Sequence, residues 1–547
     1  MSEVLPGTRV SPPLTDDGSV QFDREYDVIV VGYGGAGAVT ALEALEQGAS
    51  VAVVDRFEGG GATAISGSVI YAGGGTSLQK RLGVEDSVDN MYRYLRQETD
   101  GVVNDETVLE FCRQSPENID WLAGHGVAFS GGLFNQKTTY PVHGYSLYPS
   151  GNELDYTYSR EADPAARGHI PNGIAKWSAM GPAFYKPIAA AVARLKPAFY
   201  RQHRVNRLVV DQTGRVVGVE CGALASSRFA ALRHRLWSRL AVATHMYSPG
   251  VADVFRAWAD GIEKGSRGEG VRIKARKGVV LAAGGFIFNR EMVKKYAARF
   301  EPGMRLGTAG DDGSGIALGA SVGGALKHMG NASAWRFINP PVSWTRAILV
   351  NRQGNRYVSE TLYGAAIGTE MMRNHEANGI LILDSTLYDQ SVSEISAKTA
   401  RLITRLQFRD AISKAVKADS LDELASRTGI DPSGLRETVA SYNAIAEKGE
   451  RDEFQKSPEY IQAIVKPPFY AIDLSAGKGG ITPVITLGGL QVDEASGRVL
   501  KESGEPVPGL YAAGRNAVGI PSNSYVTGLS VADCIFSGRR AARDLCR

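Results

Sequence analysis

Apolar residues near the N-terminus form two short runs on either side of a glycine-rich turn. The segment "EYDVIVVGYGGAGAVTALEALEQGASVAVVDR", residues 25–56, opens with a β-branched apolar run and passes through the glycines. It continues as an alanine-rich stretch of helical character and closes in a second apolar run. Short apolar runs of this kind are typical of strands in a buried parallel sheet. The pattern predicts one βαβ unit.

Two later segments, "RLVVDQTGRVVGVEC" (207–221) and "VRIKARKGVVLAAGG" (271–285), also have the pattern of strands that would normally be close neighbours in a sheet. The intervening residues 223–266 are interpreted as an insertion of amphipathic helices. Apolar residues at helical spacing alternate there with arginines: Phe229, Leu232, Leu236 and Leu240 with Arg228, Arg233, Arg235 and Arg239. Two interpretations remain open, a peripheral contact with a membrane interface or a helix that packs against protein or in a dimer.

Beyond residue 315 the pattern becomes mixed and charged, and apolar glycine-rich sequence returns at "ITPVITLGGLQVD". We therefore expect an α/β fold in which a Rossmann-like domain is interrupted by an inserted α+β cap domain. The expected divisions are a polar tail at 1–24, the first part of the nucleotide domain at 25–325, the cap at 326–479 and the second part at 480–547. A chain of 547 residues is long enough for two cores.

The composition narrows the classes of partner. Lys and Arg total 61 against 58 Asp and Glu, a net charge of +3, so no basic field favours nucleic acid. The four cysteines have no metal-ligand spacing, and we expect no metal site. The N-terminal segment lacks the apolar core of a secretory signal and no run of 18 apolar residues is present. A reduced, cytoplasmic protein without a membrane span is the expectation.

The glycine turn has the spacing of a dinucleotide fingerprint. Gly32, Gly34 and Gly37 form GxGxxG between strand and helix, and Asp55 ends the next strand. Such glycines allow a tight turn, the approach of a pyrophosphate and close packing, while the acid binds ribose hydroxyls. The alternative is a glycine turn without a ligand, and the fingerprint does not distinguish NAD from FAD.

Three distant segments favour FAD. They are "GGGATAISGS" after Asp55, "VVLAAGGF" in mid-chain, and the C-terminal "LYAAGRNAVGIPSNSYVTGLSVADC". In the last of these, a strand and a polar turn lead to a helix that begins near Gly528. The amides of such a helix N-terminus could hold the pyrimidine carbonyls of a flavin.

Together these motifs resemble the flavoprotein superfamily of succinate dehydrogenase, fumarate reductase and 3-ketosteroid dehydrogenases over nearly the whole chain. The resemblance implies a FAD domain with an inserted cap and substrate between them. Carried over by position, the FAD contacts would be Gly32, Gly34, Gly35, Ala36, Gly37, Asp55, Arg56, Ala62, Thr63, Ser66, Gly67, Val205, Ala283, Gly284, Asp312, Gly514, Arg515, Gly528, Leu529, Ser530 and Val531. Some members attach flavin through a histidine at the position of Ala62, so we expect non-covalent FAD here.

The dicarboxylate reductases of this superfamily carry an arginine and a histidine that are missing here. Tyr363 stands at or beside the arginine's position in "NRYVSETLYGAA", and Ile485 stands at that of the histidine in "PVITLGG". A site without these cations favours a neutral, apolar ketone. The segments resemble 3-ketosteroid dehydrogenases, most closely the 4,5-desaturating (5α) type, through Tyr363 and Tyr525, with Thr527 where serine is usual. The Tyr-x-Gly-Pro-Gly run of 1,2-desaturating relatives reads "YVTGLS" here.

The resemblance implies that Tyr525 removes the α-proton of a 3-ketosteroid while a β-hydride passes to flavin N5. A phenol has a pKa of about 10, so Thr527, Tyr363 or the helix N-terminus would have to stabilise the phenolate. The structural alternatives are packed aromatics for the two tyrosines and a helix cap for Thr527. Tyr145 and Tyr148 are either pocket-lining or ordinary loop aromatics.

Other functions stay open at this point: 1,2-dehydrogenation of a 3-ketosteroid, an ene-reductase acting on a non-dicarboxylate, or a flavin-binding protein without turnover. The steroid and the physiological electron acceptor are not identified by the sequence, a quinone being one candidate acceptor.

Overall fold

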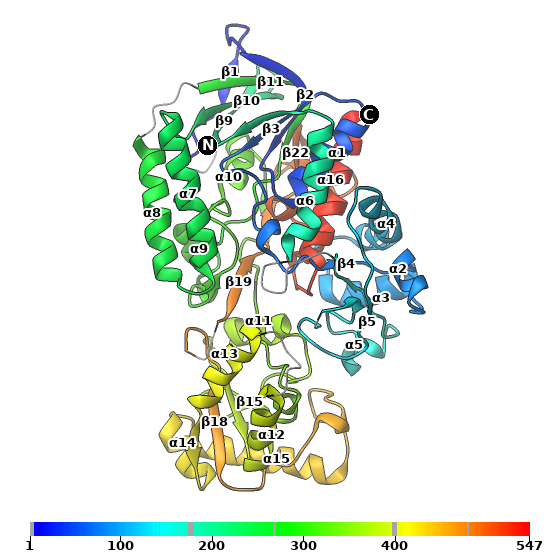
Figure 1. Ribbon diagram of the computed structural model, residues 1–547, viewed down its shortest axis with the longest axis vertical. Helices are drawn as coiled ribbons and strands as arrows, with labels where there is room; N and C mark the ends of the chain where they lie inside the picture. The colour runs from blue at the N-terminus through cyan, green and yellow to red at the C-terminus, as the bar shows by residue number, and fades with distance from the viewer. Residues whose placement is uncertain (1–4, 142, 173–179, 266–269, 397–401, 479–480) are drawn as a thin grey trace.

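The computed structural model describes residues 5–141, 143–172, 180–265, 270–396, 402–478 and 481–547. The boundaries expected at 266 and 479 lie outside these residues. Figure 1 shows two bodies stacked along the long axis, a larger one that contains both described chain ends and a smaller one formed by the middle of the chain.

The larger body is built on a nine-stranded sheet with the order β1-β9-β10-β11-β2-β3-β8, to which β22 and β21 are added beside β11. Its strands are β1 (Leu14–Asp16), β2 (Arg24–Val31), β3 (Val51–Asp55), β8 (Ala198–Arg201), β9 (His203–Asp211), β10 (Val216–Ala223), β11 (Gly270–Leu281), β21 (Arg498–Leu500) and β22 (Pro506–Ala512). The central strands β22, β11, β2, β3 and β8 run parallel. Strands β10 and β11 pair antiparallel, with Cys221 opposite Val271, as expected of neighbours separated by an insertion.

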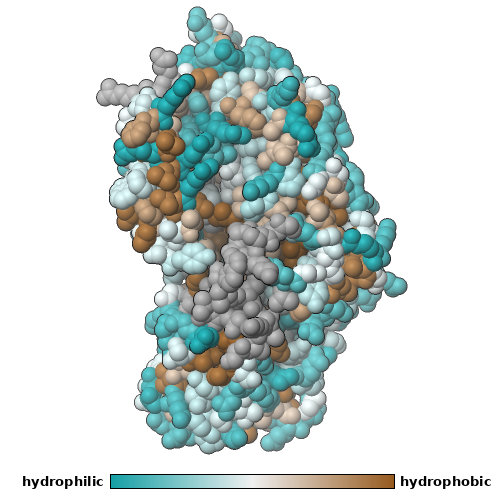
Figure 2. Space-filling model, viewed as in Figure 1, coloured by the Kyte–Doolittle hydropathy of each residue, from teal (hydrophilic) through white to brown (hydrophobic). Residues whose placement is uncertain are grey.

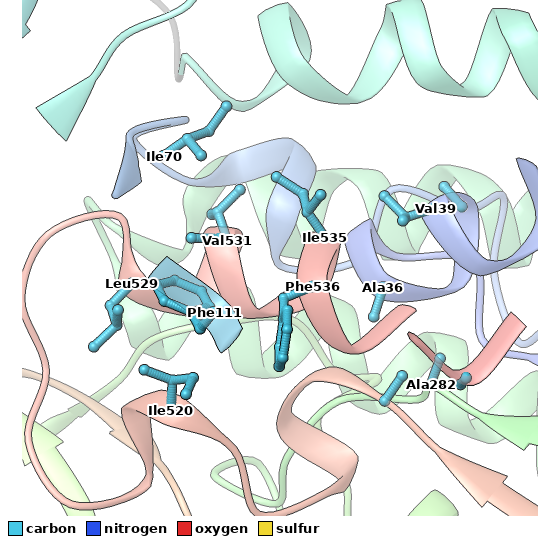
Figure 3. Packing of buried hydrophobic residues seen from close by; sticks show 14 of the residues in the cluster. Ala36, Val39, Ile70, Phe111, Ala282, Ile520, Leu529, Val531, Ile535 and Phe536 are labelled. Atoms are coloured by element: carbon cyan, nitrogen blue, oxygen red, sulfur yellow. The ribbon is translucent and has the colours of Figure 1, made fainter. Parts of the chain in front are cut away.

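The apolar run of β2 is buried on both faces, which explains why it shows no polar alternation. Val28 and Val30 pack toward α1 (Gly35–Glu46) and α16 (Leu529–Cys546), whereas Ile29 and Val31 belong to the core on the other face. Figure 3 shows Ala36 and Val39 of α1 close to Ile535 and Phe536 of α16. The first and last helices of the nucleotide domain are therefore one packing unit although nearly 500 residues separate them.

Further helices cover this body. They are α6 (Gly181–Arg194), α9 (Arg290–Tyr296) and α10 (Ser314–Ser321). Helix α6 packs with α1, whereas α9 and α10 belong to the core on the other face. Beside it lies a small four-stranded sheet, β4 (Ile70–Tyr71), β7 (Gly168–His169), β6 (Tyr145–Tyr148) and β5 (Gly132–Leu133), with α2 (Ser77–Arg81), α3 (Val88–Thr99), α4 (Asp105–Gly124) and α5 (Tyr156–Ser159).

The smaller body has its own sheet and core. Strands β15 (Ile348–Val350), β16 (Ile380–Leu383), β18 (Phe469–Asp473) and β17 (Val416–Ala418) pair antiparallel. Helices α11 (Gly364–Asn374), α12 (Ser385–Ser396), α13 (Leu402–Ser413), α14 (Leu421–Thr428) and α15 (Pro432–Lys448) accompany it. Trp344 and Leu381 are fully buried in this second core. The predicted fold class, a Rossmann-like domain with an α+β insertion, is confirmed.

A three-stranded sheet, β12 (Met304–Arg305), β19 (Pro483–Thr486) and β14 (Ala332–Ala334), lies where the bodies meet, and Figure 1 shows β19 running between them. Strand β13 (Leu326–Lys327) pairs with β20 (Gly489–Leu490). We propose to keep the divisions at 325/326 and 479/480, although Leu326, Met329 and Ala332 still pack with the core of the larger body. The tail 1–24 contributes β1, which pairs parallel with β9.

The insertion between β10 and β11 is a helical hairpin, α7 (Arg228–His245) and α8 (Pro249–Gly265). It stands at one side of the larger body in Figure 1. Trp237 packs against Phe255 and Trp258, with ring centroids 5.8 and 4.7 Å apart, so an aromatic cluster joins the two helices.

Candidate active site

The dinucleotide turn requires its glycines for steric reasons. Gly32 has φ 98°, and a Cβ there would come within 2.6 Å of the Ala282 carbonyl oxygen on the neighbouring strand. A Cβ at Gly37 would stand 1.9 Å from the Gly32 carbonyl oxygen. The turn and the start of α1 thus exclude larger residues at both positions.

The start of α1 is open toward a ligand. Gly34 caps the helix without a side-chain hydrogen bond, and the nearest atom to a Cβ built on it is the Cα of Gly61 at 3.9 Å. Gly35 N–H donates to Thr63 Oγ1 at 3.2 Å, which ties the turn to the segment after Asp55. A bare helix N-terminus beside open space fits an anionic pyrophosphate.

Asp55 organises this region through the backbone. Its carboxylate accepts from the N–H groups of Tyr33 at 2.7 Å, Phe57 at 2.7 Å and Gly59 at 3.2 Å. These contacts occupy three of about four acceptor positions of a carboxylate. The predicted contact with ribose hydroxyls would therefore use the acceptor position of the carboxylate that is still open. The main observed role of Asp55 is to fix the turn.

Arg56 has partners other than those the motif suggests. Its guanidinium donates to Glu263 and Asp260 of α8, to Asp312 at 2.9 Å and to the Ala309 carbonyl oxygen. All five N–H donors of an arginine are engaged in this way. Arg56 and Asp312, both predicted FAD contacts, are thus joined in an ion-pair network that holds the helical hairpin.

The second part of the cradle lies around the end of β22. Ala283 N–H donates to Asn516 Oδ1 at 2.8 Å, and Arg515 pairs with Asp311 at 2.5 Å. Gly284 has φ 83° and a Cβ there would collide with Asp311. Asp311, adjacent to the predicted Asp312, is therefore the acid that contacts the "AAGG" turn. The sequence motif "GDDG" could not distinguish these neighbours.

Unsatisfied donors indicate that a polar ligand belongs here. Within the described part of the chain, buried Arg515 Nη1 and Asn516 Nδ2 have no hydrogen-bond partner. Buried donors without partners are costly, and a ligand rich in carbonyl and phosphate oxygens would satisfy them. The N-terminus of α16 is also uncapped by any side chain, because Gly528 with φ 96° precedes it. The residues present fit FAD.

The remaining predicted FAD contacts are distributed around this cradle. Ala62, Thr63, Ser66 and Gly67 form or follow a short 3-10 turn, Val205 is buried in β9, Gly514 packs on Ala36, and Leu529, Ser530 and Val531 make the first turn of α16. Their contacts with FAD stay predictions.

The structure brings Tyr363 and Thr527 together from positions 164 residues apart. Tyr363 precedes α11 of the smaller body, and its backbone N–H donates to Asn152 Oδ1 at 2.6 Å. Its hydroxyl bonds the Thr527 hydroxyl and accepts from Trp335 Nε1 at 2.9 Å. Thr527 is held by Ser150 through two backbone-directed bonds of 3.1 and 3.2 Å. The hydroxyl pair is therefore fixed from both bodies.

Tyr525 lies beside this pair. Its ring meets Trp335 edge-on, with centroids 4.9 Å apart. Burial raises the pKa of the Tyr525 phenol above its usual value, as does nearby Tyr140, while the Gly528 backbone N–H and Arg515 act in the opposite direction. Burial likewise raises the pKa of Tyr363 well above its usual value. The N-terminus of α16 is thus the group that contacts Tyr525, and Thr527 is the partner of Tyr363.

Two site residues were not predicted from the sequence. Trp335 follows the three-residue strand β14 and contacts both Tyr363 and Tyr525. Tyr140 is close enough to both tyrosines to raise their pKa values, and its hydroxyl lies 2.5 Å from a Cβ built on Gly67. The only indication in the sequence that Trp335 belongs to a site is that it is a tryptophan, because a buried indole N–H needs a hydrogen-bond acceptor. Tyr140 lies in a segment without periodic pattern.

Of the two loop tyrosines, Tyr148 is fully buried and its hydroxyl donates to the Thr139 carbonyl oxygen at 3.2 Å. Hydrogen bonding with Thr527 also lowers its pKa, against the larger effect of burial. Tyr145 packs edge-on against Phe134 at 5.2 Å. Tyr148 is thus a buried neighbour of Thr527.

Comparisons with known proteins show the family to which the chain belongs. A family model described as FAD binding domain matches residues 27–523. A 3-oxo-5-alpha-steroid 4-dehydrogenase of Comamonas testosteroni is 36% identical over 510 residues, 90% of this chain and 93% of that protein. A 3-oxosteroid 1-dehydrogenase of Mycolicibacterium smegmatis is 26% identical over 583 residues, 95% of this chain and 97% of that protein.

Among solved structures, a 3-ketosteroid-delta4-(5alpha)-dehydrogenase from Rhodococcus jostii RHA1 in complex with 4-androstene-3,17-dione has a TM-score of 0.82 and 32% identity, covering 98% of this chain and 100% of that one. Fold and site together define a FAD-dependent oxidoreductase. The chain belongs to the FAD binding domain family, and its predicted resemblance to 3-ketosteroid dehydrogenases, including the 4,5-desaturating type, is confirmed.

Proposed function

We propose that this enzyme dehydrogenates a 5α-3-ketosteroid between C4 and C5, with Tyr525 as the base. The observation that carries the proposal is the arrangement of three hydroxyls, in which Tyr525 contacts the N-terminus of α16 beside the bonded pair Tyr363 and Thr527. The names of the 36% identical relative and of the similar crystal structure support the same substrate class and bond.

The absence of substrate-binding cations at the two diagnostic positions supports a neutral ketone. Tyr363 occupies one position, and its hydroxyl is bonded to Thr527 and Trp335. Ile485 occupies the other, in β19, and is buried. A phenol and an alkyl group supply no charge to hold a dicarboxylate, whereas a phenol can hydrogen-bond a ketone.

In the proposed reaction, Tyr525 Oη takes the proton from C4, which lies next to the C3 ketone. Bound FAD supplies the acceptor for the hydride that leaves C5. The Gly528 backbone N–H stabilises the phenolate form of Tyr525, since a donor to the charged form lowers a phenol pKa. Trp335 and Thr527 orient the Tyr363 hydroxyl, which either polarises the ketone or tunes Tyr525.

The test is anaerobic incubation of the purified holoprotein with a 5α-saturated 3-ketosteroid, with the product double bond located by NMR. A 4-ene product together with bleaching of the flavin is the expected result. A saturated steroid that leaves the flavin oxidised, while an activated alkene reoxidises the reduced protein, would instead identify an ene-reductase.

A second candidate is 1,2-desaturation, favoured by the 26% identity to a 3-oxosteroid 1-dehydrogenase over nearly the full length. The flavin helix of this chain begins "YVTGLS", without the Gly-Pro-Gly run that marks that type. A 1-ene product in the same NMR experiment would select this candidate.

The pH dependence of flavin reduction follows from the raised pKa of Tyr525. Because burial raises this pKa above about 10, the phenolate is scarce at neutral pH and its fraction grows about tenfold per pH unit. We expect the anaerobic reduction rate at saturating steroid to rise with pH from 7 upward, up to about tenfold per unit. Stopped-flow absorbance measures it. A rate that is flat or falls over this range would contradict a tyrosine base of raised pKa.

A further inference from the structure

The outer face of the hairpin α7–α8 is apolar and exposed. Eight of the fourteen large apolar side chains that are exposed in the described part of the chain belong to this hairpin, six on its two helices and two in the turn between them. They are Phe229, Leu232, Leu236, Met246, Tyr247, Val251, Val254 and Trp258. Figure 2 shows brown residues along the side of the molecule where Figure 1 draws the hairpin. This concentration is far from the scattered exposure that needs no explanation.

The spacing places these side chains in one stripe on each helix. Positions 229, 232 and 236 on α7, and 251, 254 and 258 on α8, repeat every three or four residues. Each helix is about 26 Å long at 1.5 Å per residue. The cluster of Trp237, Phe255 and Trp258 joins the helices. The two stripes therefore form a single surface rather than two independent ones.

The inner face holds the hairpin firmly on the nucleotide domain. Glu263, whose side chain is 2% exposed, contacts Arg56 at 3.0 Å, Arg204 at 2.8 Å and His234 at 3.0 Å. Burial alone would raise the pKa of Glu263, but His234 and the two arginines lower it overall. At the other end of the hairpin, Asp253 bonds Arg305 of β12 at 2.8 Å. The apolar surface is thus presented by a fixed element.

Charge is distributed unevenly over the hairpin, although the side chains of Asp253 and Asp260 are 40 and 42% exposed. The acids of the hairpin, Asp253, Asp260 and Glu263, are all engaged in ion pairs with arginines. Four cations of the hairpin are exposed, Arg228, Arg233, Arg239 and Lys264. An apolar surface bordered by exposed cations, with the acids of the hairpin held in ion pairs, complements a layer of hydrocarbon under anionic headgroups.

We propose that this hairpin surface, defined by the eight exposed apolar side chains above, docks the enzyme on an anionic lipid bilayer, with both helices lying in the interface plane. A second copy of the chain is a poorer occupant. An isologous contact would bring the arginines of each copy toward those of the other, and the partly exposed hairpin acids, Asp253 and Asp260, are already paired with Arg305 and Arg56. The described part of the chain has no helix long and apolar enough to cross a bilayer, so the contact is peripheral. Docking would also bring the enzyme to lipophilic substrate, a link that rests on the proposed function, whereas the binding itself does not.

The test is sedimentation of the full-length holoprotein with vesicles of phosphatidylcholine alone or mixed equally with phosphatidylglycerol. The double variant Leu232→Asp/Trp258→Asp changes two exposed positions and should lower the partition coefficient on mixed vesicles by on the order of a hundredfold. Val465→Asp, at a position 62% exposed and outside the hairpin, is the matched control and should bind like the parent. Arg239→Gln should lose about fivefold, only on the anionic vesicles.

Unchanged flavin content and thermal midpoint would show that each variant is folded, and flavin reduction with a soluble steroid should match the parent. Equal sedimentation of parent and double variant would overturn the proposal. So would a parent that ignores both vesicle types yet is a dimer by light scattering, with the double variant monomeric, because the surface would then be an interface between copies.

Discussion

Replacing Tyr525 by phenylalanine should slow the reduction of the flavin by steroid about a hundred- to ten-thousandfold, the usual cost of losing a general base. The ring, its edge-on contact with Trp335 and its packing remain, whereas the oxygen that accepts the C4 proton is lost. Steroid binding should survive, visible as a perturbation of the flavin spectrum. Single-turnover stopped-flow kinetics on protein with full FAD occupancy measures the effect.

Phenylalanine variants of two other tyrosines serve as comparisons for Tyr525→Phe. Tyr363→Phe removes a hydroxyl bonded to Thr527 and Trp335, and should cost about tenfold or less if that hydroxyl only orients or polarises. Tyr145→Phe changes a half-buried ring packed on Phe134 and should leave the rate unchanged. If Tyr525→Phe keeps close to the parent rate, the base is elsewhere, with Tyr363 and then Tyr140 the next to examine.

The larger architecture could be predicted from the chain because its signals are local. The βαβ unit of residues 25–56, the paired strands on either side of 223–266 and the return of apolar sequence near 480 each depend on a few neighbouring residues. The glycine requirement at Gly37 is equally local, because a Cβ there would meet the Gly32 carbonyl oxygen of the same turn, whereas at Gly32 it would meet Ala282 on a strand far along the chain. Features that depend on neighbouring residues in this way can be predicted from a single sequence.

The partners of individual side chains could not be predicted in the same way. Thr527 is one of three groups that the sequence offers to stabilise Tyr525, two residues away, but its hydroxyl is bonded to Tyr363, which the smaller body supplies. Arg56 follows the acid of the fingerprint, yet its donors are taken up by acids more than 200 residues later. In both examples the deciding contact depends on how an insertion folds back, which no local pattern encodes.

Trp335 shows the same limit at the site itself. It lies at the end of a three-residue strand in the sheet between the two bodies, and its sequence context is unremarkable. Only the packed structure shows that its indole reaches both tyrosines. Its position makes the geometry of the base sensitive to how the two bodies are joined.

Replacing Gly528 by alanine should remove most of the bound FAD and, with FAD added back, slow flavin reduction by about a hundredfold. A Cβ at Gly528 would lie 2.7 Å from the Tyr71 backbone nitrogen and 3.0 Å from the carbonyl carbons of Ile70 and Val69. Backbone atoms cannot step aside as a flexible side chain can, so the first turn of α16 must move. That turn carries the amide that contacts Tyr525, and a displacement of about 1 Å at a reacting group is enough for a loss of this size.

Gly504→Ala is the matched control that separates the collision from backbone strain. Gly504 has φ 85°, close to the 96° of Gly528, but no atom lies within 4 Å of its Cβ position. Both variants therefore carry the same cost of about 1 kcal/mol or more for a left-handed alanine, and only Gly528→Ala also meets β4. We expect Gly504→Ala to keep its flavin and its rate, with flavin absorbance per protein and stopped-flow kinetics as the measurements. If both variants lose flavin equally, strain in the fold and not the position of α16 governs the cofactor, and the role given to the helix N-terminus in supporting Tyr525 would be wrong.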